Sequence, residues 1–276
     1  MPREVLHHLN IIDPVRRELF LPISQRMAAV GGETLNYDLP WLLFGYPVRA
    51  GQSMVVVAMM HNPTGRDLSD VHVKFYFKYL EVGRPWPLFD VYPFQLDVAF
   101  PAGDKSFTLP PGRSSFSYEA TPALEGRMLG IGAHLHEYAE NITFEDVTTG
   151  EQIWEGLPIL GEDGELHGVT VGRLYRTGGA RLFTDHVYRV TVRYDNPTGD
   201  SIPEGGMGVV AGIFSPGGGY AWPTVDRADT LYALDRAHYM REVRGTLDVI
   251  RSLVSGSGPP RVEDEHAEHE HAEHTH

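Results

Sequence analysis

The chain has 276 residues, with 37 acidic and 23 basic side chains and a formal net charge of −14. A field of this sign repels phosphate, so we expect no nucleic-acid partner. The chain has no cysteine, which excludes disulfides, thiolate metal sites and a cysteine nucleophile. No stretch approaches the roughly 20 apolar residues that span a bilayer, so the protein is expected not to be membrane-spanning. The start lacks the apolar core of a secretory signal, and a periplasmic or extracellular location is favoured only if a signal was removed.

Glycine, proline, tyrosine and phenylalanine are abundant, which favours short strands and turns over a helical bundle. Ser53–Met60 is a continuous apolar run and predicts a buried strand. Val71–Tyr79 and Val187–Tyr194 alternate between apolar and polar residues and predict half-buried strands. Two further segments predict strands: Met128–His136 and Asn141–Val147. The expected fold class is therefore mainly β.

One turn pattern occurs twice, as His61–Gly65 (HNPTG) and as Asp195–Gly199 (DNPTG). Asn-Pro opens a turn and glycine closes it. Each copy follows a predicted strand and precedes another apolar segment, so we interpret the sequence as two related β-sandwich domains in tandem. The alternative is that two unrelated hairpins use the same favourable turn chemistry.

These signals predict an N-terminal sandwich over residues 1–92, which is short and need not be complete, and a second sandwich over residues 93–224. Residues 225–254 predict one long amphipathic helix, because apolar residues recur at three- and four-residue steps, and Asp226 or Asp229 is placed to cap it. Such a helix packs either on its own domains or on a partner, which would be another protein or a second copy of the chain.

The C-terminal residues 255–276 form a Gly/Ser/Pro linker followed by a tail rich in histidine and glutamate. This composition predicts disorder. The five tail imidazoles would bind Cu²⁺, Ni²⁺ or Zn²⁺ loosely, and the alternative is a solvated acidic tail or a tag-like extension.

Two features outside the tail indicate metal chemistry. His134 and His136 lie two residues apart on a predicted strand, so both imidazoles point to one face, which is half of a metal site. Hydrogen-bonded or surface histidines are the alternative. Met207 lies in the segment Glu204–Gly208 (EGGMG), where its thioether is a soft ligand suited to Cu(I). A core methionine placed where glycines let backbones approach is the alternative there.

Taken in order, these residues resemble a family. The set is His7-His8, His61, His134-x-His136 and Met207, and it is similar to the ligand order of the type II, ascorbate-dependent copper monooxygenases, the peptidylglycine α-hydroxylating and dopamine β-monooxygenase group. The resemblance covers roughly residues 5–216. It implies two tandem jelly-roll-like β-sandwiches, each holding one copper.

The resemblance also implies a role for each copper site. His7, His8 and His61 would hold the copper that transfers electrons. His134, His136 and Met207 would hold the copper at which dioxygen is activated and a C–H bond is hydroxylated. The sequence thus predicts a copper-binding protein, with a copper-dependent monooxygenase as the activity if it is an enzyme.

Other hypotheses stay open, because only six residues precede His7 and the chain lacks the disulfides usual in that family. One is a non-catalytic tandem β-sandwich subunit that docks on a larger assembly through residues 226–254. The other is a metal carrier built around the histidine-rich tail.

Overall fold

The computed structural model describes residues 6–31, 42–60, 62, 65–68, 72–81, 87–99, 105–162, 164–218 and 220–240, without the side chains of His7 and His8. The chain divides into two compact units, residues 1–236 and 237–276. The continuation of the predicted helix beyond residue 240 and the tail over residues 255–276 lie outside the described residues.

The fold is mainly β and is built of several antiparallel sheets, which confirms the predicted fold class. Its elements in chain order are β1 Leu6–Arg17, β2 Ser24–Gly31, β3 Phe44–Gly45, β4 Val55–Met60, β5 Phe89–Asp90, β6 Tyr92–Asp97, β7 Phe107–Leu109, β8 Gly112–Ala120, β9 Gly126–Leu135, β10 Ala139–Asp146, β11 Glu151–Gly156, β12 Pro158–Leu160, β13 Leu166–Val169, the short 3-10 helix η2 Leu174–Thr177, β14 Ala180–Leu182, β15 Tyr188–Asn196, β16 Ile202–Gly206 and β17 Gly208–Pro216.

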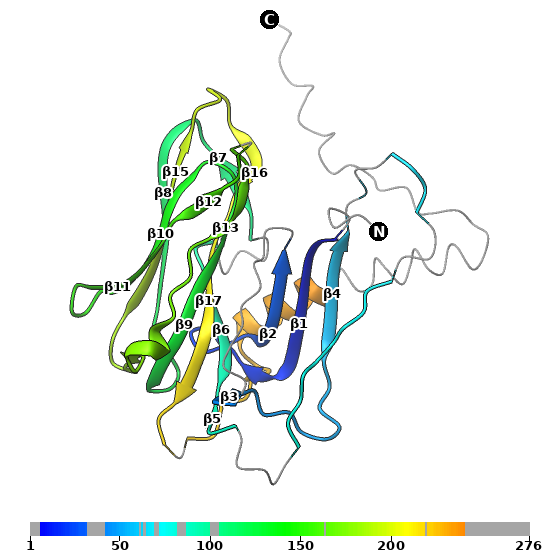
Figure 1. Ribbon diagram of the computed structural model, residues 1–276, viewed down its shortest axis with the longest axis vertical. Coiled ribbons are helices and arrows are strands. Elements are labelled where there is room, and N and C mark those ends of the chain that lie inside the picture. Colours follow the sequence, from blue (N-terminus) through cyan, green and yellow to red (C-terminus); the bar gives the residue numbers. More distant parts are fainter. Residues whose placement is uncertain are drawn as a thin grey trace, which may run out of the picture. The chain divides into compact units, whose positions relative to one another are not determined.

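Two four-stranded sheets form the layers of a β-sandwich (Figure 1). One has the order β11-β10-β15-β8 and the other β14-β9-β17-β6. The alternating pattern of β15 explains its place, because Tyr188, Val190, Val192 and Tyr194 point inward and are fully buried. They meet apolar side chains of the facing sheet, among them Met128, Ile131, Leu135, Val210 and Phe214.

The N-terminal strands form a separate three-stranded sheet with the order β2-β1-β4. The prediction of a strand at Ser53–Met60 is confirmed as β4, but the prediction that it is buried is wrong, since Met59 and Met60 are 50% and 45% exposed. The predicted strand at Val71–Tyr79 is also wrong, because the described residues 72–81 form no strand. The division into sandwiches at residue 92 stays a prediction.

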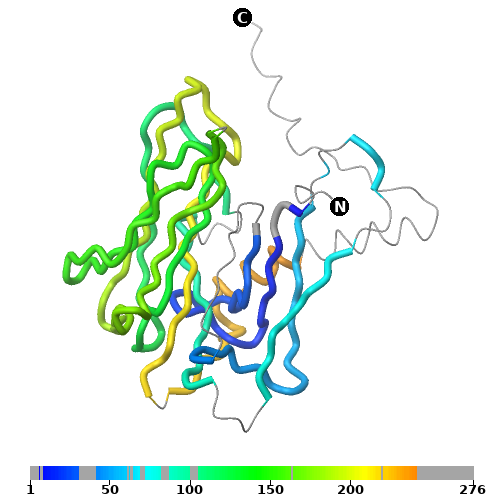
Figure 2. Tube along the Cα trace, in the orientation of Figure 1, coloured from blue at the N-terminus to red at the C-terminus, as the bar shows by residue number. Residues whose placement is uncertain are grey.

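The connection between β1 and β2 anchors this sheet. Leu19, Phe20, Leu21 and Ile23 are buried in the hydrophobic core of the sandwich. The Phe20 ring packs edge-on against those of Phe94, Phe144 and Tyr188, at centroid distances of 5.7–6.0 Å. Figure 2 shows this blue connection reaching in among the green and yellow strands. The first strands therefore supply part of the sandwich core.

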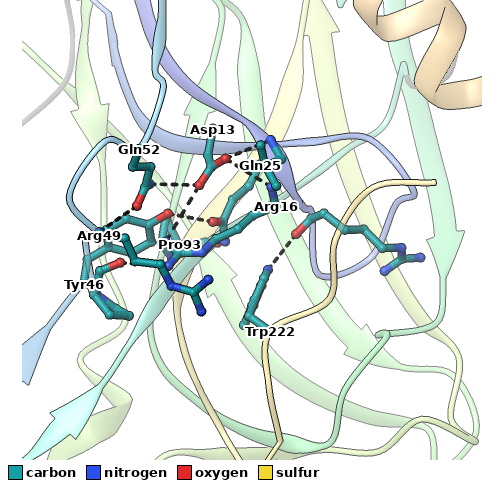
Figure 3. Close-up of polar contacts among 11 residues, drawn as sticks. Asp13, Arg16, Gln25, Tyr46, Arg49, Gln52, Pro93 and Trp222 are labelled. Atoms are coloured by element: carbon teal, nitrogen blue, oxygen red, sulfur yellow. Dashed lines mark hydrogen bonds and ion pairs between the residues drawn. The ribbon is translucent and has the colours of Figure 1, made fainter. Parts of the chain in front are cut away.

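A polar network fixes the same strands to the sandwich edge (Figure 3). The side chain of Gln25 donates to the Pro93 carbonyl at 2.9 Å and accepts from the Tyr46 hydroxyl at 3.0 Å. In the same network, the carboxylate of Asp13 accepts a hydrogen bond from the side-chain amide of Gln52 at 2.9 Å. The indole of Trp222 donates to the Arg17 carbonyl at 2.8 Å. These bonds satisfy polar groups that the packing removes from water.

Glu18 is the most deeply buried charged group of this region, with no exposed surface. Its carboxylate accepts hydrogen bonds from the backbone amides of Leu19 and Gln95, both at 3.2 Å, and of Arg26, at 2.8 Å. Burial raises the pKa of Glu18 to about 7, although these donors and the Arg26 charge oppose the rise. One carboxylate therefore joins β1, β2 and β6.

Each of the two NPTG turns contains the same kind of hydrogen bond. The side-chain amide of Asn196 donates to the carbonyl of Asp200, and that of Asn62 donates to the carbonyl of Arg66, each four residues on and each at 2.8 Å. Asn196 is buried and also donates to the Pro110 carbonyl, so it ties its turn to the start of β8. The repeat thus uses the same local turn chemistry.

The predicted C-terminal helix begins at Thr230 and is described as far as Met240. Asp229 caps it, because its carboxylate accepts from the amides of Leu231 and Tyr232. Within this helix, Asp235 forms a buried bidentate ion pair with Arg26 of β2. Among the described residues, no helix is long and apolar enough to cross a membrane.

Replacing Phe20 tests the shared core. Phe20→Ala removes a ring that is 3% exposed and should lower the free energy of unfolding by about 3–5 kcal/mol. Val15→Ala, on the preceding strand β1 and 48% exposed, should change it by less than about 0.5 kcal/mol. Denaturant unfolding measures both, and equal effects would contradict the placement of Phe20.

Glu18 predicts a pH dependence of stability. Its pKa is about 7 in the folded state and near 4.5 in the unfolded chain, so the folded state binds the proton more tightly. The stabilisation that proton binding gives the folded state is fully present below pH 4.5. It is lost as the pH rises through 7, by about 3 kcal/mol in total.

Glu18→Gln should remove that slope between pH 5 and 8, at a lower stability throughout, because an amide cannot accept all three backbone bonds. Glu151→Gln, at an exposed position of β11, should keep the slope. Urea unfolding at several pH values measures it. An unchanged slope in Glu18→Gln would show that another group titrates.

Candidate metal centre

The histidine pair lies at the end of β9, where the strand pairs with β17. In this ladder His134 is opposite Val209 and Leu135 is opposite Gly208. Leu135 faces the sandwich core, as does Gly208, whose position is close to Val192. Because side chains alternate along a strand, His134 and Val209 point to the opposite, outer face of the sheet. His136 follows on that same face.

Met207 is next to His136. The regular pairing ends at Gly208 and Leu135, and one residue further the Tyr194 hydroxyl lies between the two strands. It accepts from the amides of His136, at 3.3 Å, and Met207, at 3.0 Å, and donates to the Met207 carbonyl. Met207 lies between β16 and β17, outside both strands, and its side chain is buried.

The two imidazoles have a spacing that suits one ion. Their ring centroids are 5.2 Å apart and their planes lie at 88°. Two imidazoles bound to one metal at about 2.0 Å, in a roughly tetrahedral arrangement, have ring centres about 5 Å apart. The donor set of two ring nitrogens and one thioether fits copper better than a hard cation, which prefers oxygen.

The second nitrogen of His136 has a backbone partner. Its Nδ1 lies 3.2 Å from the carbonyl oxygen of Glu204, which accepts a hydrogen bond when Nδ1 carries the proton. Such a bond to a backbone carbonyl commonly fixes the tautomer of a metal-binding histidine and leaves Nε2 to bind. Glu204 has φ +52°, a left-handed conformation that is uncommon outside glycine. The turn that carries Met207 is therefore shaped to present this carbonyl.

The glycines around Met207 explain why the turn packs so closely. A Cβ on Gly206 would lie 2.0 Å from the Phe107 ring, and one on Gly208 would lie 2.8 Å from Val192. Both glycines thus let the backbone approach the sandwich core. Met207 is itself buried, so the alternative of a core methionine among glycines stays open.

Asp97 is a neighbour that the sequence did not single out. Asp97 lies on β6 opposite Val209 of β17, and Val209 is also opposite His134 of β9. Asp97 and His134 therefore belong to one cross-strand row, and Asp97 is 1% exposed. Burial raises the pKa of Asp97, while the Lys105 ammonium, 3.9 Å away, and the charge of His134 lower it. The only sequence signal was an acidic residue at the end of a largely apolar strand.

The structure does not describe the side chains of the other predicted copper site. His7 and His8 lie on β1, but their side chains and all of His61 are outside the described residues. No cluster of three His, Asp or Glu side chains that could hold a metal occurs in the described part of the chain. His186, for which the sequence offered no partner, contacts Asp146 at 2.6 Å.

Alanine at Gly208 tests the backbone packing beside Met207. Gly208→Ala should lower the free energy of unfolding by about 1–3 kcal/mol, because the methyl group overlaps fully buried Val192. Gly132→Ala, on the partner strand, meets only Val171 at 3.4 Å and should be nearly neutral. Thermal or urea unfolding compares the two. A neutral Gly208→Ala would contradict the close approach.

The sequence matches no protein-family model and no curated protein. The resemblance to the copper monooxygenases therefore rests on the ordered ligand residues alone. Of those six residues, the described structure gives side-chain positions for His134, His136 and Met207.

Proposed function

We propose that this protein binds one copper ion through His134, His136 and Met207 on the outer face of the β9–β17 pair. The observation that carries the proposal is the Tyr194 hydroxyl, which bonds the backbones of both His136 and Met207. Residues far apart in the chain, one on a histidine strand and one in a glycine turn, are thereby held side by side.

The ligand types support copper in both of its common oxidation states. Imidazole binds Cu(II) and Cu(I), and a thioether favours Cu(I), the state that reacts with dioxygen. Three protein ligands leave a coordination position for an exogenous molecule. Bound copper would supply one-electron and oxygen chemistry here.

The chain's own residues would orient the ligands. Glu204 holds the His136 ring through its carbonyl, and the half-buried His134 lies in the row of Asp97. We further propose that the activity is an oxygen-dependent oxidation of a C–H bond driven by a reductant such as ascorbate. That step comes from the resemblance, and its substrate is not assigned.

A titration with Cu(I) tests the binding proposal. In competition with a chromophoric Cu(I) chelator, the full chain should hold one tight equivalent beyond the weak binding of its tail. His136→Ala should weaken that equivalent at least about 10-fold, and Met207→Leu should weaken Cu(I) more than Cu(II). His167→Ala, at an exposed position of β13, is the matched histidine control. Equal affinities in all four proteins would refute the site.

The proposed activity has its own test. Copper-loaded protein with ascorbate should consume oxygen, and His136→Ala should lose that consumption while His167→Ala keeps it. Tight Cu(I) binding without oxygen consumption in the wild type would refute the proposed oxygen chemistry and leave the copper site standing.

A further inference from the structure

Tyr194 belongs to one layer of the sandwich but acts on the other. It lies on β15 and is fully buried, and the ring of Phe107 packs edge-on against it at 6.1 Å. Its hydroxyl reaches the end of the facing sheet, at the point where β9 and β17 stop pairing. A long apolar side chain thus carries a single polar atom across the core.

Every hydrogen-bonding site of this hydroxyl is in use. A tyrosine hydroxyl has one proton to donate and two lone pairs that accept. The proton goes to the Met207 carbonyl, and the lone pairs accept from the amides of Met207 and His136. The hydroxyl replaces the cross-strand bonds that the ladder would need for one more pair. It therefore sets the distance between the two residues.

The cost of removing the hydroxyl is high because its partners are buried. Met207 is 8% exposed, and both of its backbone polar groups depend on this one atom. A buried backbone group left without a partner costs about 1–3 kcal/mol.

We infer that Tyr194 is a positioning residue of the copper site, whose hydroxyl holds the Met207 thioether and the His136 imidazole at the spacing that one ion requires. The inference rests on the proposed function. Tyr194 touches no metal. It acts through the backbones of two ligands, in a site where a displacement of about 0.5 Å is enough to lose productive geometry.

Tyr194→Phe tests the inference, because it keeps the ring and removes one oxygen. Loss of a group that orients metal ligands typically weakens binding by about 10–100-fold. We expect a loss of this size for Cu(I), a smaller one for Cu(II), and loss of the sulfur scatterer from the copper X-ray absorption spectrum. A merely structural role would leave the sulfur signal and the Cu(I)/Cu(II) affinity ratio unchanged.

Tyr188→Phe is the matched control. Tyr188 lies on the same strand, is equally buried, and its hydroxyl accepts from the backbone amide of Phe183 at 3.0 Å. Loss of the Tyr188 hydroxyl also leaves a backbone amide without its hydrogen-bond acceptor, but this amide lies away from the histidine pair. The control should lose stability while keeping the Cu(I) affinity and the sulfur signal of the wild type.

A copper-free measurement separates this inference from the proposed function. In the metal-free wild type, the amide hydrogen of Met207 should exchange as slowly as that of Val210 in the β9–β17 ladder. It should exchange faster in Tyr194→Phe and stay slow in Tyr188→Phe, where Phe183 exchanges faster instead. The exchange rate of the Met207 amide in the wild type can be measured even if neither variant folds.

The outcomes are distinct. Wild-type protein without a tight Cu(I) equivalent refutes the proposed function and with it the role of Tyr194 at copper. Tight wild-type binding that Tyr194→Phe leaves unchanged, sulfur signal included, overturns the inference alone. Rapid exchange at Met207 in the wild type overturns the inference whatever the copper result.

Discussion

The register between β9 and β17 is the constraint on which the site depends. Pairing of Leu135 with Gly208 puts apolar residues on the core face and sends His134 to the outer face. A slip of one residue would exchange the two faces, burying the imidazoles in the core and exposing Leu135. The hydrophobic core therefore fixes the register, and the register sends His134 to the outer face and brings the backbone of Met207 close to that of His136.

Polar contacts also hold the N-terminal strands in place. The N-terminal strands reach the sandwich through the apolar β1–β2 connection, yet next to it lie the Glu18 carboxylate, with its three amide donors, and the Arg26–Asp235 ion pair. Buried charges of this kind are costly unless they are fully hydrogen-bonded. They add directional contacts to the non-directional apolar packing that anchors these strands.

The amount that could be predicted from the sequence follows the range of the interactions. Alternation predicted β15 and the shared face of His134 and His136, because side-chain direction is a local property of a strand. Local pattern also found the Asp229 cap. It failed for β4, where a continuous apolar run is partly exposed, because burial depends on which other segments cover a strand.

The bonds of Tyr194 could not be predicted in the same way. Its hydroxyl joins β15 to residues on two other strands, and nothing in the residues around Tyr194 signals that contact. The same holds for Asp97, which shares a row with His134 only through the intervening Val209. Sequence order suggested which residues to propose as copper ligands, whereas the groups that position those residues belong to the tertiary structure.

In the proposed site, two imidazoles and one thioether converge on a single ion. Anomalous diffraction at the copper edge, from crystals of the full chain loaded with Cu(I) without oxygen, would locate that ion. We expect one strong peak within about 2.0–2.5 Å of a ring nitrogen of His134, a ring nitrogen of His136 and the Met207 sulfur. Copper bound only elsewhere, with the Met207 sulfur turned away from both rings, would contradict it.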